Sequence, residues 1–252
     1  MPRYDFTSPR LFVAADLGPG LSVVLEAPQA HYLKNVLRLK AGDTVLAFNG
    51  RDGEWRTAAE MSGRSTVRLA VAEQTRPQPA AGDLQFLFAP LKRARLDYMV
   101  QKAVEMGASR IAPVFTRHSQ AERVNLDRMR ANAIEAAEQC GILSVPEVVE
   151  AAPLARAMAA LGHGRVLIFC DEDAPVSDPL AALGARQTSA PAPRPPLAVL
   201  IGPEGGFAED ERAMLLTRDN VIRLALGPRI LRADTAAVAA LALVQAVLGD
   251  WR

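Results

Sequence analysis

Two apolar runs near the C-terminal end of the chain break off at a glycine-proline pair and are then followed by helix-like sequence. The run 197–201 leads into Gly202-Pro203-Glu204-Gly205-Gly206, and the run 221–226 leads into Gly227-Pro228. Continuous apolar runs of this length between turn signals are typical of buried parallel strands. Because ligands of open α/β sheets bind at the carboxyl ends of the strands, the two loops predict a binding site.

These loops carry no phosphate-binding signature. Neither loop reads G-x-G-x-x-G or G-x-x-x-x-G-K-S/T, the patterns that cradle the phosphates of nucleotides. The second loop adds Arg229, Arg232 and Asp234 to its exposed backbone. We therefore expect a ligand that is held through backbone and adenine-type contacts rather than through its phosphates.

The composition limits the classes of protein to which the chain can belong. Of 252 residues, 50% are hydrophobic and 23% are charged, which is ordinary for a soluble globular protein and excludes a disordered chain. The formal net charge is only +1, so nucleic acid can bind only through a local patch. The most apolar segment, 236–248, is shorter than the roughly 20 residues of a membrane helix. We expect a cytoplasmic protein with no membrane partner.

The cysteines and one acidic triplet bear on metal binding. Cys140 and Cys170 match no zinc pattern and make a poor disulfide framework, which favours free thiols in a reducing compartment. Asp171-Glu172-Asp173 follows a strand-like run, and carboxylates suit a hard cation such as Mg²⁺. Because the triplet lacks a glycine-spaced loop pattern, we predict no metal site, with cation binding as the weaker alternative.

The first third of the chain is typical of a small β-barrel. Turn signals separate short strand-like runs at 11–14, 21–25, 44–48, 55–60 and 66–72. The stretch 75–83 has two prolines, a glycine and no apolar pattern, which is typical of a linker. We therefore expect a barrel domain over residues 1–74, a linker over 75–83 and a second domain over 84–252.

One helix interrupts this barrel. In the segment 30–39, the side chains of Leu33, Val36 and Leu37 share one helical face and are expected to point into the core. The other face carries polar side chains, those of His31, Lys34, Asn35 and Arg38. This face is either a solvated surface or an RNA-facing edge to which Arg10 also contributes, and the spacing leaves both open.

From residue 84 onward, strands alternate with helices, which predicts an α/β domain with a parallel sheet. Lys92, Arg93 and Arg95 stand close together where a helix begins, although the helix dipole favours anions there. This mismatch mildly favours phosphate binding over a solvated helix start. The last helix, 235–248, is apolar almost all round, which predicts burial on several sides and a dimer interface.

Five motifs, taken in their order and spacing, resemble one known family. They are His31-x-x-x-Asn35-Val36-Leu37-Arg38-Leu39-x-x-Gly42-Asp43, Lys102-Ala103-x-Glu105-Met106-Gly107, Glu135-Ala136-Ala137-Glu138-Gln139, Ile201-Gly202-Pro203-Glu204-Gly205-Gly206-Phe207 and Leu226-Gly227-Pro228-Arg229-Ile230-Leu231-Arg232-x-x-Thr235-Ala236. Each motif alone is weak, but together they span nearly the whole chain. The chain resembles the RsmE family of bacterial ribosomal RNA uridine-N3 methyltransferases.

The resemblance implies a fold and an activity. The fold would be a PUA-like β-barrel followed by an α/β SPOUT domain with a deep trefoil knot, and the protein would be a homodimer through the SPOUT domain. The cofactor would be S-adenosylmethionine. The substrate would be a uridine in the decoding region near the 3′ end of 16S rRNA, with the assembled small ribosomal subunit expected as the preferred partner.

The resemblance also assigns site residues. The catalytic residues facing the uridine would be Arg232 and Glu138. The cofactor would be bound by Phe169, Asp171, Ile201, Gly202, Glu204, Gly206, Leu226, Gly227, Ile230, Leu231, Thr235 and Ala236. The RNA would be bound by Arg10, His31, Asn35, Arg38, Lys92, Arg93 and Arg117.

Some positions depart from the family pattern. Arg117-His118-Ser119 replaces a stretch that often carries an acidic residue and arginine, and Ile142 stands where arginine is common. Ala208 replaces a helix-capping serine or threonine, a loss of roughly 0.5–2 kcal/mol. Two alternatives remain, namely a non-catalytic RNA-binding or ribosome-assembly protein and a SPOUT enzyme that methylates the ribose 2′ oxygen.

Overall fold

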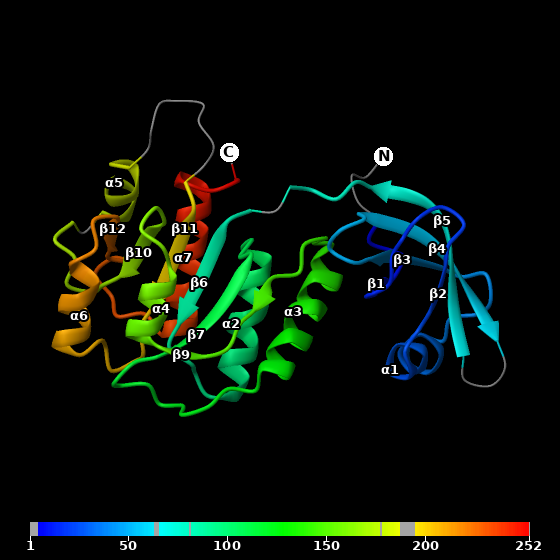
Figure 1. The fold of residues 1–252 in the computed structure, drawn as a ribbon, viewed down its shortest axis with the longest axis horizontal. Helices are drawn as coiled ribbons and strands as arrows, with labels where there is room; N and C mark the ends of the chain where they lie inside the picture. Colours follow the sequence, from blue (N-terminus) through cyan, green and yellow to red (C-terminus); the bar gives the residue numbers. More distant parts are fainter. Residues whose placement is uncertain (1–4, 63–65, 81, 177, 187–194, 252) are drawn as a thin grey trace. The chain divides into compact units, whose positions relative to one another are not determined.

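A computed structural model describes residues 5–62, 66–80, 82–176, 178–186 and 195–251 of the chain (Figure 1). The chain divides into two compact units. Unit 1 comprises Met1–Ala81 together with Ile134–Val145, and unit 2 comprises Gly82–Ala133 together with Pro146–Arg252. The short segment Ile134–Val145 therefore belongs with the N-terminal part of the chain, although it lies far along the sequence.

Unit 1 is built on a five-stranded sheet of order β1-β3-β4-β5-β2. Only the β1–β3 pair is parallel. Apolar side chains from alternate strand positions fill its core, among them those of Leu11, Val45, Val67 and Leu69. The strands are β1 (Arg10–Phe12), β2 (Ser22–Val24), β3 (Thr44–Phe48), β4 (Glu54–Ser62) and β5 (Thr66–Arg76). The predicted strands are all present, and β5 continues into the first two residues of the stretch expected to be a linker.

The helical segment of unit 1 differs from its prediction. An α-helix, α1 (Ala27–His31), continues directly into a π-helix, η1 (Tyr32–Val36). Leu33 is fully buried as expected, but Val36 is 59% exposed and Leu37 is 36% exposed. The N–H of Leu37 bonds to the carbonyl of Tyr32, five residues back. This wider turn rotates the later side chains off the core face, so the burial predicted for Val36 and Leu37 was wrong.

Unit 2 contains a seven-stranded sheet whose main path runs β12-β10-β11-β6-β7-β8, with β9 paired to β7. Its paired strands are all parallel. Strands β10 and β11 are continuous apolar runs, and β6 is apolar except for Gln85, as expected for strands covered on both faces. The bounds are β6 (Leu84–Phe88), β7 (Arg110–Phe115), β8 (Glu147–Val148), β9 (Ala152–Pro153), β10 (Val166–Cys170), β11 (Leu197–Ile201) and β12 (Val221–Leu224).

Helices cover this sheet. Side chains of α4 and α6 pack in one apolar cluster with β10 and β11, which includes Met158, Leu215 and Phe169. The last helix, α7, packs against β11, α2 and α5. The helices are α2 (Arg93–Glu105), α3 (Leu126–Cys140), α4 (Leu154–Ala160), α5 (Pro179–Gly184), α6 (Glu209–Leu216) and α7 (Ala233–Val247). The predicted α/β class is confirmed, and the trefoil knot stays a prediction.

One buried polar side chain of the apolar helix α7 connects the ends of two helices. Gln245 is buried, its amide nitrogen donates to the carbonyl of Met106 at 2.7 Å, and its amide oxygen accepts from the Asp250 N–H at 3.0 Å. Both ends of the Gln245 amide have hydrogen-bond partners, so its burial leaves no end of the amide unsatisfied. The side chain thereby joins the end of α2 to the end of α7. Within the described residues, no helix is long and apolar enough to cross a membrane.

Candidate functional site

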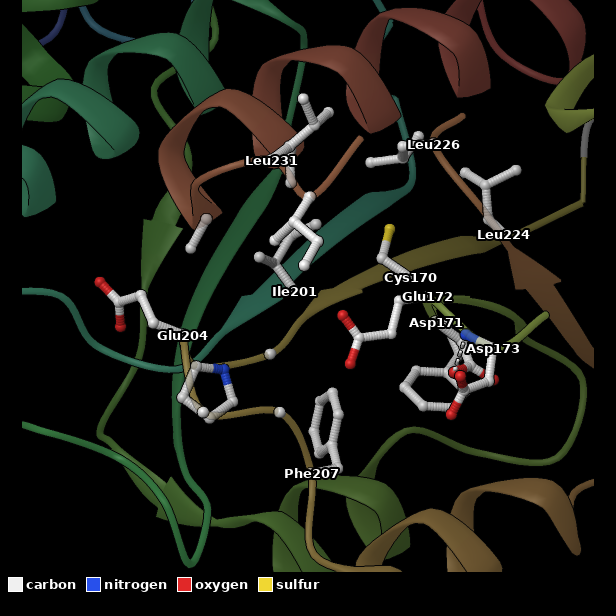
Figure 2. Close-up of a pocket in the computed structure, with 18 of the residues that line it drawn as sticks. Cys170, Asp171, Glu172, Asp173, Ile201, Glu204, Phe207, Leu224, Leu226 and Leu231 are labelled. Atoms are coloured by element: carbon white, nitrogen blue, oxygen red, sulfur yellow. Dashed lines mark hydrogen bonds between the residues drawn. The ribbon is translucent and has the colours of Figure 1, made fainter. Parts of the chain in front are cut away.

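Three adjacent strands of unit 2 end at the rim of one pocket. β10 lies between β12 and β11 in the sheet, and the loops that follow these three strands enclose a space of about 450 Å³ (Figure 2). The volume is within the range of small-molecule sites. Parallel strands place their carboxyl ends on the same edge, so the predicted convergence of the two glycine-proline loops follows directly from the sheet order.

The pocket is lined by apolar side chains and by carboxylates. Figure 2 shows Ile201, Leu226 and Leu231 grouped in one part of the pocket. The carboxylate of Glu172 lies in the space between Ile201 and Phe207, and Glu204 lies apart from it at the left of the view. The backbone of residues 202–206 and 226–230 completes the lining. Such a surface can accept a flat apolar ring at one end and a positively charged group at the other.

The structure brings together nearly all of the residues predicted to bind a cofactor. Thr235 is the exception, because it lies exposed in the first turn of α7 and does not line the pocket. The predicted residues that do line it are Phe169, Asp171, Ile201, Gly202, Glu204, Gly206, Leu226, Gly227, Ile230, Leu231 and Ala236.

Gly202 is required by a close approach. A β-carbon at this position would lie 2.5 Å from a ring carbon of Phe207. The Phe207 ring packs edge-on against Phe169, with ring centres 5.1 Å apart, and is therefore held from the other side. Only glycine allows the loop after β11 to pass over this ring and leave the pocket open.

Two of the three carboxylates after β10 bind arginines. Asp171 is buried and accepts hydrogen bonds from Arg223 at 2.7 Å and from Arg212 at 3.1 Å. Asp173 pairs with Arg212, and its backbone carbonyl accepts from Arg223. These bonds join the end of β10 to α6 and β12, and the hydrogen bond to Asp173 is the main cause of a raised pKa at Arg212. In the described part of the chain, no cluster of three metal-ligating side chains is found.

Glu172, the carboxylate between Asp171 and Asp173, is not bound by an arginine. Glu172 is exposed, lines the pocket and makes no hydrogen bond or ion pair with the described residues. Its Oε1 atom lies 3.9 Å from the position that a β-carbon on Gly206 would occupy. Sequence reasoning named Glu172 only as one of three carboxylates weighed for cation binding, and it did not single out Arg212 or Arg223. A usable signal was present in Arg223, a charged residue inside an otherwise apolar strand.

Cys170 also lines the pocket but carries no charge. Burial, assisted by the nearby negative charge of Asp171, raises the pKa of its thiol to about 12. The thiol therefore stays protonated at neutral pH and is a poor nucleophile. It contributes a compact apolar surface to the pocket.

Arg232 lies immediately before α7, between two residues that line the pocket, Leu231 and Ala233. Its side chain is exposed and makes no hydrogen bond or ion pair with the described residues. Among the described residues, no acidic neighbour forms an ion pair with Arg232. Glu204 lies 3.7 Å from Arg95, and Asp234 accepts the N–H of Thr235 at 2.9 Å. Arg232 itself does not line the pocket, but it is an exposed cation next in sequence to two residues that do.

Glu138 lies in unit 1 and does not line the pocket of unit 2. Its carboxylate accepts the N–H of Phe12 at 2.8 Å. Burial raises the pKa of Glu138, the bond from Phe12 lowers it, and the charge of Glu135 raises it further, so that the pKa is above its ordinary value. Glu138 helps to line a separate cavity of about 400 Å³ within unit 1, together with Arg10 and Tyr32.

The residues predicted to bind RNA fall into different settings. Arg10 is buried, and its guanidinium donates to Glu54 at 2.9 Å, so its charge is already engaged inside unit 1. Arg117 is exposed but pairs with Asp210 at 2.6 Å. The side chain of Arg93 lies outside the described part of the structure. The remaining predicted side chains are exposed, namely those of His31, Asn35, Arg38 and Lys92.

Comparison with known proteins defines the class. A family model described as an RNA methyltransferase domain matches residues 78–245, and a model described as an RNA methyltransferase PUA domain matches residues 25–69. A solved structure of a putative methyltransferase from Legionella pneumophila, in complex with the bound cofactor SAM, is 26% identical, with a TM-score of 0.79 over 95% of this chain and 97% of that one. The chain is therefore an RNA methyltransferase by its family and its fold.

Curated relatives narrow the class to one family. The ribosomal RNA small subunit methyltransferase E of Synechocystis is 30% identical over 95% of this chain and 78% of the relative. The enzyme of the same name from Rickettsia conorii is 28% identical over 94% of each chain. The chain belongs to the ribosomal RNA small subunit methyltransferase E family.

Proposed function

We propose that this protein transfers the methyl group of S-adenosylmethionine to N3 of a uridine near the 3′ end of 16S rRNA. The observation that carries the proposal is the pocket at the ends of β10, β11 and β12, read together with the family. The activity belongs in the cytoplasm, where ribosomal subunits are available. The assembled small subunit is the proposed partner, because a folded particle presents a defined shape around the target base.

The pocket of unit 2 fits this cofactor. The apolar side formed by Ile201, Leu226 and Leu231 suits the adenine ring, and the exposed backbone of both loops can bond its polar edge. Negative charge on the other side suits a cofactor that carries a sulfonium and an ammonium group. The volume of about 450 Å³ admits a nucleoside with an amino-acid chain in a bent shape.

The reaction needs alignment and charge stabilisation. When bound, S-adenosylmethionine supplies an electrophilic methyl group, and the sulfur takes the bonding electron pair as the methyl passes to N3. The loops after β11 and β12 position the reacting groups, which can lower the barrier by up to about 7–11 kcal/mol. Arg232 stabilises the negative charge on uracil O2 or O4 as N3 loses its proton. Glu138, which lies in unit 1, is proposed to face the uridine from the family resemblance alone.

RNA recognition is proposed to involve exposed groups of both units. In unit 1 these are His31, Asn35 and Arg38, and in unit 2 they are Lys92 and Arg117. Arg93 is proposed from its sequence position alone. N3 of a paired uridine is hidden, so the target base must be unpaired or flipped out. Arg10 is proposed to act indirectly, by holding the strand beside this surface.

The protein is proposed to form a homodimer through unit 2. Partly exposed apolar side chains flank the buried face of α7 on both sides, Val238 on one side and Leu243 and Val247 on the other. A helix that is apolar on more than one side is stabilised when a second surface covers it. Light scattering on the purified chain should give twice the monomer mass, and a strictly monomeric protein would contradict this arrangement.

The activity can be tested directly. Small ribosomal subunits that lack the modification are incubated with the protein and labelled S-adenosylmethionine, and the RNA is digested to nucleosides. The expected product is 3-methyluridine at a single position. Label in a 2′-O-methyl nucleoside would replace the proposal with ribose methylation. Absence of both cofactor binding and methyl transfer would indicate a non-catalytic RNA-binding protein.

The close approach at Gly202 gives a quantitative prediction. Gly202→Ala is expected to raise the Kd for S-adenosylmethionine at least about tenfold. The new β-carbon would collide with the Phe207 ring, and relief of the clash must move the ring or the loop that lines the pocket. Isothermal titration measures the change. The matched control is Gly205→Ala, whose nearest neighbour, the Cβ of His118, lies at 3.4 Å. An affinity of Gly202→Ala equal to that of the unchanged protein would argue against this loop as a binding element.

A further inference from the structure

The loop after β10 carries three consecutive carboxylates, but only one of them is available to a ligand. Asp171 and Asp173 are bound by Arg212 and Arg223. Glu172 has no such bond, although it lies near enough to Arg212 to contribute to the raised pKa of that residue. Because its two neighbours fix the loop, the backbone of Glu172 is held in place while its carboxylate stays unpaired.

The carboxylate of Glu172 lies inside the binding pocket. It comes from the β10 loop and approaches Gly206 of the β11 loop, with 3.9 Å between its Oε1 and the β-carbon position on that glycine. In the view of Figure 2 it lies in the open space between Ile201 and Phe207, whereas Glu204 lies farther to one side. The other acid of the pocket that could bind a cation, Glu204, is already close to Arg95. Glu172 is therefore a pocket-lining carboxylate that makes no ion pair with the described residues.

This position matches one part of the proposed cofactor. The apolar side of the pocket suits the adenosine, and the open rim suits the amino-acid end. The sulfur joins these two halves, so it must pass between them, where the carboxylate of Glu172 lies. A sulfonium bears a positive charge that a carboxylate attracts, and its polarised C–H groups can contact carboxylate oxygens. The demethylated product, S-adenosylhomocysteine, is a neutral thioether at the same atom.

We propose that Glu172 is a specificity-determining residue that provides the counter-charge for the sulfonium and so favours the methyl donor over the demethylated product. The proposal rests on the proposed function, since it takes the donor to be S-adenosylmethionine. It assigns Glu172 no part in the chemical step. This preference would make S-adenosylhomocysteine easier to replace by S-adenosylmethionine, because the neutral thioether lacks the attraction between the sulfonium and Glu172.

The test compares three ligands on the purified full-length protein by titration calorimetry. They are S-adenosylmethionine, S-adenosylhomocysteine and 5′-methylthioadenosine, which keeps the adenosine and thioether but lacks the amino acid. Glu172→Gln keeps the size of the side chain and removes its charge. It is expected to raise the Kd of the donor about tenfold and that of the product at most about threefold, with methylthioadenosine unchanged. Glu172→Asp, which keeps the charge, should retain most of the preference for the donor.

A matched control removes the same charge elsewhere. Glu209→Gln lies in the exposed first turn of α6, outside the pocket, and should leave all three affinities unchanged. Equal losses for donor and product in Glu172→Gln would overturn the proposal, because they would point to the ribose or the ammonium group. No loss for either ligand would overturn it as well. Failure of the unchanged protein to bind any of the three ligands would instead contradict the proposed function.

Discussion

Arg232→Ala is expected to lower kcat for RNA methylation by about 10²–10³-fold and to leave the Kd for S-adenosylmethionine within about twofold. The expected loss is that of one preorganised group that stabilises charge in the transition state. Arg232 is suited to this role because its exposed side chain follows and precedes pocket-lining residues, Leu231 and Ala233, and makes no ion pair with the described residues. Single-turnover methylation of small ribosomal subunits would measure the loss without interference from product release.

Two controls separate this role from a structural one. Arg156→Ala removes an exposed arginine of α4 in the same unit, outside the pocket, and should leave the methylation rate unchanged. Arg232→Lys keeps the charge but not the planar guanidinium, and should recover part of the rate. Undiminished turnover in Arg232→Ala would remove this residue from the mechanism. If Arg232→Ala instead lowered the melting temperature to near the assay temperature, the loss of rate would be attributed to unfolding and the role of Arg232 would be structural.

The α/β unit and its pocket were predictable from local sequence. Strands buried on both faces must be apolar throughout, so runs such as 166–170 and 197–201 stand out without knowledge of their partners. The glycine-proline bends then mark where these strands end. Because parallel strands end on one edge, the loops had to converge once the sheet formed. The position of Glu172 needed one more fact, namely which of three adjacent carboxylates is left unpaired.

The sequence was less informative where a small shift in a helix changes the exposed side. Regular α-helical spacing places Val36 and Leu37 with Leu33, but the π-helix η1 turns them outward. Thr235 was expected in the pocket, but α7 begins at Ala233, and Thr235 lies exposed in its first turn. In both cases the sequence predicted a helical segment, but the direction in which the side chains point depended on the local backbone hydrogen bonds, which composition does not reveal.

Long-range polar partners were beyond sequence reasoning altogether. Arg10 has the appearance of an RNA-binding arginine, yet its partner, Glu54, lies on a different strand far along the chain. Glu138 similarly accepts the N–H of Phe12 across an even larger sequence separation. Such pairs exist only after the sheet of unit 1 has formed, so no spacing rule predicts them. They also show that a charged residue near a site can serve to hold the fold.

Glu54→Gln is expected to lower the free energy of unfolding of unit 1 by about 3–5 kcal/mol, the usual cost of breaking a buried ion pair. Glu54 is buried and accepts hydrogen bonds from Arg10 at 2.9 Å, from Arg76 at 2.6 Å and from the hydroxyl of Thr75 at 2.8 Å. A neutral amide leaves two guanidinium groups without their common counter-charge. Urea denaturation in a Trp251→Phe background, in which Trp55 on the same strand is the remaining tryptophan, would measure the change by fluorescence.

The matched control for this prediction is an exposed pair in the same sheet. Glu73→Gln breaks the contact of Glu73 with Arg56 on the surface of unit 1 and should cost at most about 1 kcal/mol, because water screens both charges. A loss of similar size in both variants would mean that burial adds nothing to the Glu54 interaction. A loss confined to Glu54→Gln would show that this carboxylate holds β1, β4 and β5 together.

The same carboxylate gives the stability of unit 1 a definite dependence on pH. Burial alone raises the pKa of Glu54, but hydrogen bonds from Arg76, Arg10 and Thr75 outweigh it and hold the pKa below its ordinary value. A carboxyl group whose pKa is lower in the folded than in the unfolded state stabilises the fold above the unfolded value. This contribution is lost as pH falls from that value through the folded pKa. The difference in unfolding free energy between the unchanged protein and Glu54→Gln should therefore be constant from pH 8 to about pH 5.5 and shrink at lower pH. A difference that grew on acidification would require the opposite shift and would contradict the ion-paired carboxylate.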